Sequence, residues 1–436
     1  MGSEPLRSAP HPSHGRRFPG KANLSLATIK IRLSFGSTGR TICRSSMAPT
    51  ACRRARVGAA HAVMEPVMNE ARPVIADIDV FRLRVPLVRP YKLSFGAVVA
   101  YDSLIVRLRA ADGRTGSGEA TLLTGYTDET IEQSWTSACG LADALAGAAH
   151  ERFVGEVERI APGAPFLATA FMTARDCLLA HPMLRVEAPT RVPILGILNE
   201  TEPAPLEADI ERQLAAGYTT LKVKVGFDVD ADLRRVASIK AQVKGRARIR
   251  LDANQGYSAD DAIRFVKALE PEGIELLEQP CAAGDWDSHM AVVPHAAVPL
   301  MLDESIYGIE DIDRAASLGA ARFVKVKLMK LVSIDALAAA IERIRDRGMT
   351  PVLGNGVACD PGCWMEACVA ARHIDNAGEM NGFLKPRARL LASPLDFDAG
   401  DIVLRPGQSG EIDERALEDH LVGRHRGRNV LSVPAR

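Results

Sequence analysis

Three acidic residues of this chain end short apolar runs at nearly equal spacing. They are Asp252 in RIRLDAN, Glu278 in IELLEQP and Asp303 in PLMLDES, 26 and 25 residues apart. Carboxylates that meet at one place suit Mg²⁺, because this ion takes oxygen ligands and keeps positions for substrate oxygens. No His or Cys stands at these run ends, so zinc fits less well. The three residues predict a Mg²⁺ site, with Mn²⁺ as the alternative ion.

Two pairs of lysines stand on either side of these acids in the chain. Lys222 and Lys224 lie in LKVKVG, and Lys325 and Lys327 lie in VKVKLMK. Residues two apart in a strand point to the same face. A lysine close to a metal ion and to a second lysine has its neutral form favoured, so it can act as a base near neutral pH. We interpret Lys325 and Lys330 as residues of a barrel exterior or of a loop.

The elements that position these residues begin at about residue 190. Short β-branched strands alternate there with amphipathic helices, and the polar residues that close the strands recur every 24 to 28 residues. This is the length of a βα unit, and eight such units predict a (β/α)₈ barrel, with the first and last strands least defined. A doubly wound sheet is the alternative, but no GxGxxG motif is present. In the barrel, the two lysine-bearing strands face each other across the acids.

The earlier part of the chain has a different pattern. From Pro73, alternating strands with a turn at Asp112–Gly113 precede helical patterns at about 128–147 and 165–180. Strands followed by helices predict an α+β module. Residues 1–64 contain 11 Lys and Arg and one acid, which leaves three explanations: a transit peptide, a basic tail that touches membranes or nucleic acid, or translation from a start codon upstream of the real one. We favour the third.

Composition narrows the function classes. The 436 residues are 47% apolar and 25% charged, which is typical of a globular protein of two or three domains and of neither a coiled coil nor a membrane-spanning chain. Residues 65–436 hold 43 basic and 53 acidic residues, so nucleic acid and membranes are not expected partners. The eight scattered cysteines lack zinc-like spacing and indicate a reducing cytoplasm.

Several motifs together resemble the enolase superfamily, in the muconate lactonizing (muconate cycloisomerase) subgroup of the mandelate racemase–muconate lactonizing enzyme family. They are LKVKVG, LDANQGY, LEQP, LDES and VKLMK, and the resemblance covers about residues 73–425. It implies an α/β fold with a modified (β/α)₈ barrel and an N-terminal α+β capping domain. The expected ranges are 1–72 for the extension, 73–185 for the capping domain, 186–394 for the barrel and 395–436 for a segment that returns to the capping domain.

The same resemblance implies roles for individual residues. Asp252, Glu278 and Asp303 would bind an essential Mg²⁺, and Lys224 and Lys327 would be the acid and base on opposite faces of the substrate. Lys222 would lower the pKa of Lys224 and touch the substrate carboxylate. The supporting or substrate-binding residues would be Asn254, Glu304, Asn355 and Glu379.

The implied reaction is removal of a proton α to a carboxylate, which gives an enolate. Two lysines on opposite faces permit racemisation or epimerisation, whereas one base with a cationic partner permits cycloisomerisation. We expect an isomerase that acts on a small carboxylate, such as an amino-acid derivative or muconate, and assembles as a homo-oligomer. The alternatives are a carbon–oxygen lyase, of the succinylbenzoate-synthase or acid-sugar dehydratase kind, and a non-catalytic barrel scaffold.

The sequence departs from the family pattern in two places. Leu331, Val332 and Ser333 follow the sixth strand, where relatives commonly carry two glycines. The eighth strand reads Glu379-Met380-Asn381-Gly382 instead of the Asp-x-Asp that holds a substrate ammonium in dipeptide epimerases. The sequence therefore does not identify the substrate.

Overall fold

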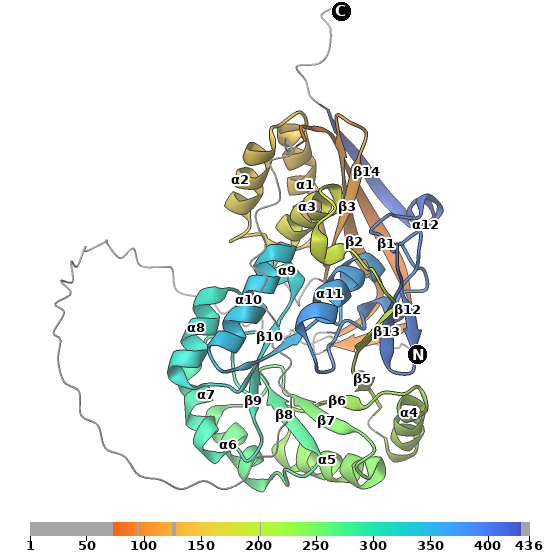
Figure 1. The fold of residues 1–436 in the computed structure, drawn as a ribbon. Coiled ribbons are helices and arrows are strands. Elements are labelled where there is room, and N and C mark those ends of the chain that lie inside the picture. Colours follow the sequence, from red (N-terminus) through yellow and green to blue (C-terminus); the bar gives the residue numbers. More distant parts are fainter. Residues whose placement is uncertain (1–72, 94–95, 124–127, 201, 429–436) are drawn as a thin grey trace, which may run out of the picture. The chain divides into compact units, whose positions relative to one another are not determined.

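The computed structural model describes residues 73–93, 96–123, 128–200 and 202–428 of the chain (Figure 1). The chain divides into two units, Met1–Val67 and Met68–Arg436, and all described residues belong to the second. The extension predicted for residues 1–72 therefore lies outside the described residues. No helix within the described ranges is long and apolar enough to cross a bilayer.

An antiparallel sheet of four strands combines the beginning and the end of the described chain. Its order is β14-β1-β2-β3, with bounds Leu421–Arg428, Ile75–Leu93, Gly96–Ala110 and Thr115–Leu122. The predicted turn joins β2 to β3, and Gly113 has a φ of +90° there, which is readily adopted without a Cβ atom. Because β14 pairs with β1, the last described strand completes this sheet.

Two of the next three helices, the first and the third, pack on the four-stranded sheet, and the second packs on the third. The three helices are α1 (Ile131–Leu145), α2 (His150–Ile160) and α3 (Pro165–Leu178). The sequence patterns predicted α1 and α3 but not α2, which is short and buries few residues. Ile78 and Val80 of β1 share one buried cluster with Phe153 of α2 and Phe171 of α3. The strands and helices thus form the predicted α+β module.

Seven parallel strands follow, in the order β11-β10-β9-β8-β7-β6-β5. Their bounds are Gly196–Leu198 (β5), Thr220–Lys224 (β6), Arg248–Asp252 (β7), Ile274–Glu278 (β8), Leu300–Leu302 (β9), Phe323–Val326 (β10) and Thr350–Leu353 (β11). Most residues of these strands are buried, as expected for a parallel sheet that is covered on both faces, although β6, β7, β8 and β10 also contain charged residues. The curled sheet and the antiparallel module confirm the predicted α/β fold class.

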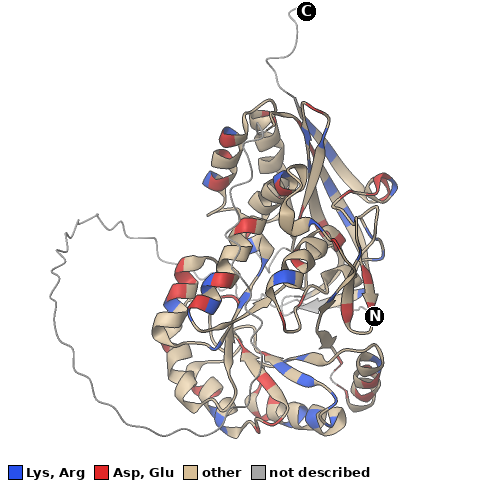
Figure 2. Ribbon diagram, viewed as in Figure 1, with Lys and Arg blue, Asp and Glu red and all other residues tan. Residues whose placement is uncertain are grey.

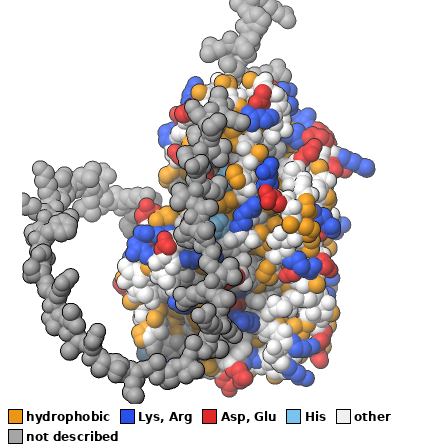
Figure 3. Space-filling view, viewed as in Figure 1, with side chains coloured by type: hydrophobic (Ala, Val, Ile, Leu, Met, Phe, Trp, Pro, Cys, Tyr) orange, Lys and Arg blue, Asp and Glu red, His pale blue; other side chains and the backbone are white. Residues whose placement is uncertain are grey.

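Helices separate the parallel strands along the chain. They are α4 (Pro203–Ala215), α5 (Val229–Val243), α6 (Ala259–Ala268), α7 (Trp286–Val292), α8 (Ile309–Leu318), α9 (Leu328–Leu331), α10 (Ile334–Asp346) and α11 (Asp360–His373). Short 3-10 helices span Pro182–Leu184, Val293–His295 and Gly382–Leu384. On the face shown in Figure 3, positive and negative side chains are interspersed.

The first and eighth barrel strands differ from the prediction. The run TRVPILGIL forms two strands, since β4 (Thr190–Pro193) pairs with β13 (Asp401–Leu404) and only β5 joins the parallel sheet. A proline cannot donate to a ladder, which is consistent with the break at Pro193. No strand is assigned among the described residues 376–385, but Gly378 forms a parallel bridge with Ile194 and the Glu379 amide donates to Leu353. This segment therefore lies at the eighth position with only a few backbone bonds.

The described C-terminal part contains two further strands and one helix. β12 (Asp396–Asp398), β13 and β4 form a three-stranded sheet, and α12 (Glu414–Asp419) precedes β14. The predicted domain boundaries, 73–185, 186–394 and 395–436, remain predictions.

Candidate active site

Charged residues lie side by side at the carboxyl ends of the parallel strands. Lys224 of β6 is in register with Asp252 of β7, which is in register with Glu278 of β8. Asp303 follows β9 directly, and Lys327 follows β10 directly. Because parallel strands end at the same edge, the spacing seen in the sequence becomes one row of charges in space. Figure 2 shows where basic and acidic residues lie along the whole chain.

Two buried ammonium groups connect the three acids that the sequence analysis selected. Lys222 Nζ lies 2.7 Å from Asp252 and 2.9 Å from Glu278. Lys325 Nζ lies 3.1 Å from Glu278 and 3.4 Å from Asp303. Both side chains are 3% exposed. The interpretation of Lys325 as an exterior or loop residue was therefore wrong, because strand alternation puts it on the same inner face as Lys327.

The two lysines predicted to be acid and base reach this row from opposite ends. Lys224 Nζ lies 2.6 Å from Asp252 and also donates to Asn254, and its side chain is 33% exposed. Lys327 Nζ lies 2.8 Å from Asp303, and its side chain is almost fully buried. Three strands separate β6 from β10 in the sheet, so the two lysines approach the carboxylates from different sides.

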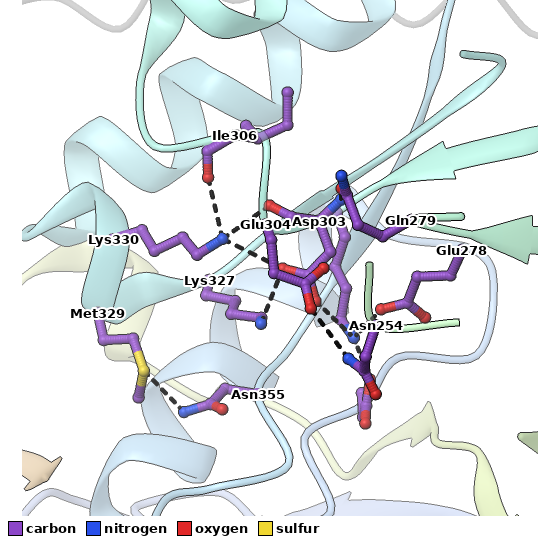
Figure 4. A network of polar contacts seen from close by, with 12 residues as sticks. Asn254, Glu278, Gln279, Asp303, Glu304, Ile306, Lys327, Met329, Lys330 and Asn355 are labelled. Carbon is purple, nitrogen blue, oxygen red and sulfur yellow. Dashed lines mark hydrogen bonds and ion pairs between the residues drawn. The ribbon is translucent and has the colours of Figure 1, made fainter. Parts of the chain in front are cut away.

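Lys330 and Gln279 are two polar residues near Asp303 that the sequence analysis did not place in the site (Figure 4). Lys330 Nζ lies 3.1 Å from the Asp303 carboxylate and donates to the carbonyls of Asp303 and Ile306. It is buried, so its interpretation as an exterior or loop residue was also wrong. The Gln279 side-chain oxygen accepts from the Asp303 amide at 2.9 Å. Together these contacts hold the Asp303 backbone and carboxylate in place.

The backbone is unusual where the strands end. Asn254, Gln255 and Gln279 have φ values of 41°, 68° and 39°, in a region that residues other than glycine rarely adopt. The Asn254 amide nitrogen Nδ2 donates to Glu304 at 2.9 Å. Asn254 and Glu304, which the sequence analysis named as separate supporting residues, are therefore hydrogen-bonded to each other, and Asn254 also contacts Lys224. Such conformations persist where the surrounding structure holds them, and they cluster at functional sites.

Glu379 and Asn355 occupy different environments. Glu379 is buried and accepts from both Lys222, at 2.9 Å, and Lys325. The Asn355 side chain bonds to its own loop, donating to the Val357 carbonyl at 2.6 Å, and also contacts Met329. The structure therefore brings Glu379 into the lysine–carboxylate network, whereas these bonds of the Asn355 side chain lie outside the network.

Burial and the neighbouring lysines have opposite effects on the pKa values of the acids. Burial raises the pKa of Glu278 to about 7, and the nearby Asp252 acts in the same direction. Burial also disfavours the charge of Asp252, but Lys222, Lys224 and Lys325 outweigh it and lower its pKa to about 2. For Lys222, burial is opposed by Asp252, Glu278 and Glu379, which raise its pKa well above the usual value.

The donor set suits a divalent cation. Within the described ranges, no group of three or more His, Cys, Asp or Glu side chains lies in metal-binding geometry. Nevertheless, each neighbouring pair of the three acids already shares one cation, the ammonium of Lys222 or of Lys325. Three carboxylates on adjacent strand ends are also hard oxygen donors. The residues present therefore fit the chemistry of Mg²⁺ or Mn²⁺.

Comparisons with known proteins agree with this arrangement. Residues 206–416 match the family model "Enolase C-terminal domain-like". The chain is 33% identical over 276 residues to the L-Lys-D/L-Arg epimerase of Methylococcus capsulatus, covering 59% of this chain and 75% of that protein. It is 25% identical over 371 residues to the N-succinyl-L-Arg/Lys racemase of Bacillus cereus, covering 80% and 98% of the two chains.

A solved structure shares the fold. The dipeptide epimerase from Cytophaga hutchinsonii, complexed with Mg and D-Ala-L-Val, superimposes with a TM-score of 0.73 at 22% identity, covering 81% of this chain and 99% of that one. The match of sequence and fold over most of both chains, together with the row of strand-end lysines and acids, leads to one conclusion: this chain belongs to the enolase superfamily, in the mandelate racemase–muconate lactonizing enzyme family, and is an isomerase.

Proposed function

We propose that this chain is a Mg²⁺-dependent racemase or epimerase that inverts the α-carbon of a carboxylate derived from an amino acid. The observation that carries the proposal is the placement of Lys224 and Lys327 at the ends of β6 and β10, on different sides of the acid row. Inversion at carbon requires a proton to leave one face and another to arrive on the opposite face. The relatives named as an epimerase and a racemase support the same reaction class.

The two lysines divide the reaction by face. A neutral lysine removes the α-proton from one face, and the ammonium of the other lysine returns a proton to the opposite face. Asp252 and Asn254 orient the Lys224 amine, and Asp303 orients that of Lys327. Lys222 and Lys325 each contact three carboxylates, and their ammonium charges hold these carboxylates beside one another. Asp252, Glu278 and Asp303 would bind Mg²⁺, which when bound supplies positive charge beside the substrate carboxylate.

The charges of the site match the expected intermediate. Five carboxylates and five lysines form the network, with Glu304 joined through Asn254: Asp252, Glu278, Asp303, Glu304 and Glu379, and Lys222, Lys224, Lys325, Lys327 and Lys330. With all ten groups ionised, their charges cancel. One divalent cation would add two positive charges, which equals the total charge of −2 on the enolate that forms when a carboxylate loses its α-proton. With both lysines protonated after the transfer, the network and one divalent cation would together balance the charge of the enolate.

The test is exchange of the α-proton in D₂O, followed by proton NMR on separate enantiomers of N-acyl amino acids and dipeptides. Lys327→Ala should lose net racemisation and still exchange one enantiomer through Lys224, and Lys224→Ala should exchange only the other. Lys240→Ala on the outer helix α5 is the control and should racemise normally. Exchange of the same enantiomer by both variants contradicts the proposal, as does loss of all exchange while Mg²⁺ still binds.

A further inference from the structure

The peptide group that joins Lys224 to Val225 is held from both sides. Its N–H donates to the Asp252 carbonyl of β7 at 2.9 Å, and its C=O accepts from Arg235 Nη1 of α5 at 2.8 Å. On this second side the strand ladder has already ended, because β5 stops at Leu198, which is paired with the residue before Lys224. A side chain therefore supplies the hydrogen-bond donor that the neighbouring strand does not.

The same guanidinium connects this carbonyl to the loop that follows β5. Arg235 Nη2 donates to the Glu200 carbonyl at 3.1 Å. Asp232, one turn earlier on α5, accepts from the Gly226 amide at 3.0 Å and from the next amide at 2.9 Å. The first two turns of α5 thus hold successive peptide groups of the connection from β6, and the one held by Arg235 follows the lysine directly.

Arg235 is a costly residue for a contact that only supports the fold. It is half-buried, and its Nε is buried with no hydrogen-bond partner among the described residues. In the same part of the chain, no carboxylate oxygen lies within 4.0 Å of its guanidinium. Burial lowers the pKa of Arg235, although the charge of Asp232 opposes this. A charge that is compensated mainly by neutral carbonyls costs stability, which favours a role in the reaction.

Lys224 has more need of such support than Lys327. The Lys224 side chain is 33% exposed, whereas that of Lys327 is 3% exposed. A long side chain with few packing contacts can adopt several rotamers. The position of the Lys224 amine therefore depends on its backbone and on the bonds to Asp252 and Asn254. A displacement of about 1 Å can lower the rate of a reaction about 100-fold.

We propose that Arg235 is a positioning residue for Lys224, because it fixes the peptide group after this lysine and thereby directs the amine to one face of the substrate. The inference rests on the racemase or epimerase function proposed above and adds a residue to it. Lys327 is held by its own contact with Asp303. Loss of Arg235 should therefore impair proton transfer on one face and spare it on the other.

Exchange of the α-proton in D₂O on separate enantiomers tests the proposal, with the most active substrate among N-acyl amino acids and dipeptides. The enantiomer that Lys327→Ala still exchanges defines the face of Lys224. Arg235→Met keeps an apolar side chain but has no donor, so it should exchange that enantiomer about tenfold or more slowly than the wild type. Exchange of the other enantiomer should stay close to the wild-type rate. Net racemisation should fall in both directions, because it requires both lysines.

The ratio of the two exchange rates separates positioning from folding, because it does not depend on the fraction of folded enzyme. Arg234→Met, at an exposed arginine of the same helix, is the control and should leave the ratio unchanged. An ammonium does not reproduce the fork of a guanidinium. Arg235→Lys should therefore shift the ratio in the same direction by a smaller factor, and it replaces Arg235→Met if that variant is insoluble.

Two results would overturn the role of Arg235 while the racemase proposal stands. They are an unchanged ratio in the soluble variants of Arg235 and an equal loss of exchange for both enantiomers. Absence of exchange by the wild type with every substrate of the screen overturns both proposals.

Discussion

Asp303 is the acid with the most ammonium neighbours. Lys327, Lys330 and Lys325 lie 2.8, 3.1 and 3.4 Å from its carboxylate, and all four side chains are buried. Their combined charge lowers the pKa of Asp303 well below its usual range, although burial opposes this. Removing one partner of a buried ion pair is costly because the remaining charge keeps no compensation.

Asp303→Asn should therefore abolish racemisation and lower the free energy of unfolding by about 3 kcal/mol. Mg²⁺ should raise the melting temperature of the wild type and have little effect on this variant, because one proposed ligand is missing. Thermal unfolding with EDTA or Mg²⁺ measures both effects, and Glu270→Gln, at an exposed residue, is the control. Full activity in Asp303→Asn would remove this residue from the metal site.

Glu366 of α11 is a buried acid near Lys327. Its Oε1 accepts from the Leu328 amide at 3.0 Å, and among the described residues its buried Oε2 has no hydrogen-bond partner. Burial raises its pKa from 4.5 to about 7, although the charges of Lys327 and Lys325 act in the opposite direction. The folded chain then binds this proton more tightly than the unfolded chain, so stability falls as the pH rises from about 4.5 to about 7.

Glu366→Gln should make the pH dependence of stability flatter, because glutamine does not ionise. Relative to the wild type, the variant should gain up to about 3 kcal/mol between pH 4.5 and pH 8. Urea unfolding of both proteins at these two pH values, with EDTA present, gives the difference. Parallel stability profiles would show that Glu366 does not titrate in this range.

At the scale of elements, the connection from α9 to α10 contains a strained turn. Val332 has a φ of 72° and a ψ of −37°, and the Ser333 amide donates to the Leu331 carbonyl at 2.8 Å. These values describe a γ-turn with positive φ, which is rare and strained. Val332 and Met329 pack against the buried cluster of the α+β module. This packing holds the turn in its strained conformation.

Val332→Gly should be more stable than Val332→Ala by about 1 kcal/mol. Both variants lose the valine packing, but only glycine adopts this conformation without strain. In a helix the order is reversed, and Ala237→Gly on the exposed face of α5 should lose about 1 kcal/mol. Urea unfolding compares the variants, and a more stable Val332→Ala would show that the turn is not strained.

At the scale of the whole molecule, the four-stranded sheet holds a loop of the barrel. Glu119 of β3 accepts from the amides of Cys359, at 2.7 Å, and Gly362, at 2.8 Å. The Tyr101 hydroxyl of β2 donates to the Gly356 carbonyl at 3.3 Å. These bonds tie the loop between β11 and α11, which includes Asn355 and Gly356, to the α+β module. The module therefore supports the loop that carries Asn355.

Deletion of residues 1–64 should leave racemase activity and the melting temperature unchanged. The expectation comes from composition, since this segment contains 11 Lys and Arg, one acid and no sustained apolar pattern. Thermal unfolding and α-proton exchange of full-length and truncated chains compare the two. A fall in melting temperature of more than a few degrees would show that the segment packs on the remainder of the chain.

The sequence alone predicted the barrel and the order of its charged strand ends. It could do so because βα units vary little in length. Residues such as Asp252, Glu278 and Asp303 therefore recur at a spacing that places them at one edge of the sheet. Strand alternation also placed Lys222 and Lys224 on one face. The same rule applies to Lys325 and Lys327, so the inward direction of Lys325 was available from the sequence.

Other features depended on contacts between residues far apart in the chain. Nothing local in the sequence places Lys330 against Asp303, aims the Gln279 oxygen at the Asp303 amide or sets Arg235 against the Lys224 carbonyl. The pairing of β14 with β1, the division of the first barrel strand and the strained turn at Val332 likewise depend on which surfaces pack together. Periodicity and element length are local properties of the chain. The partners of buried charges are decided only when the packed elements exclude water and leave each charge a limited set of neighbours.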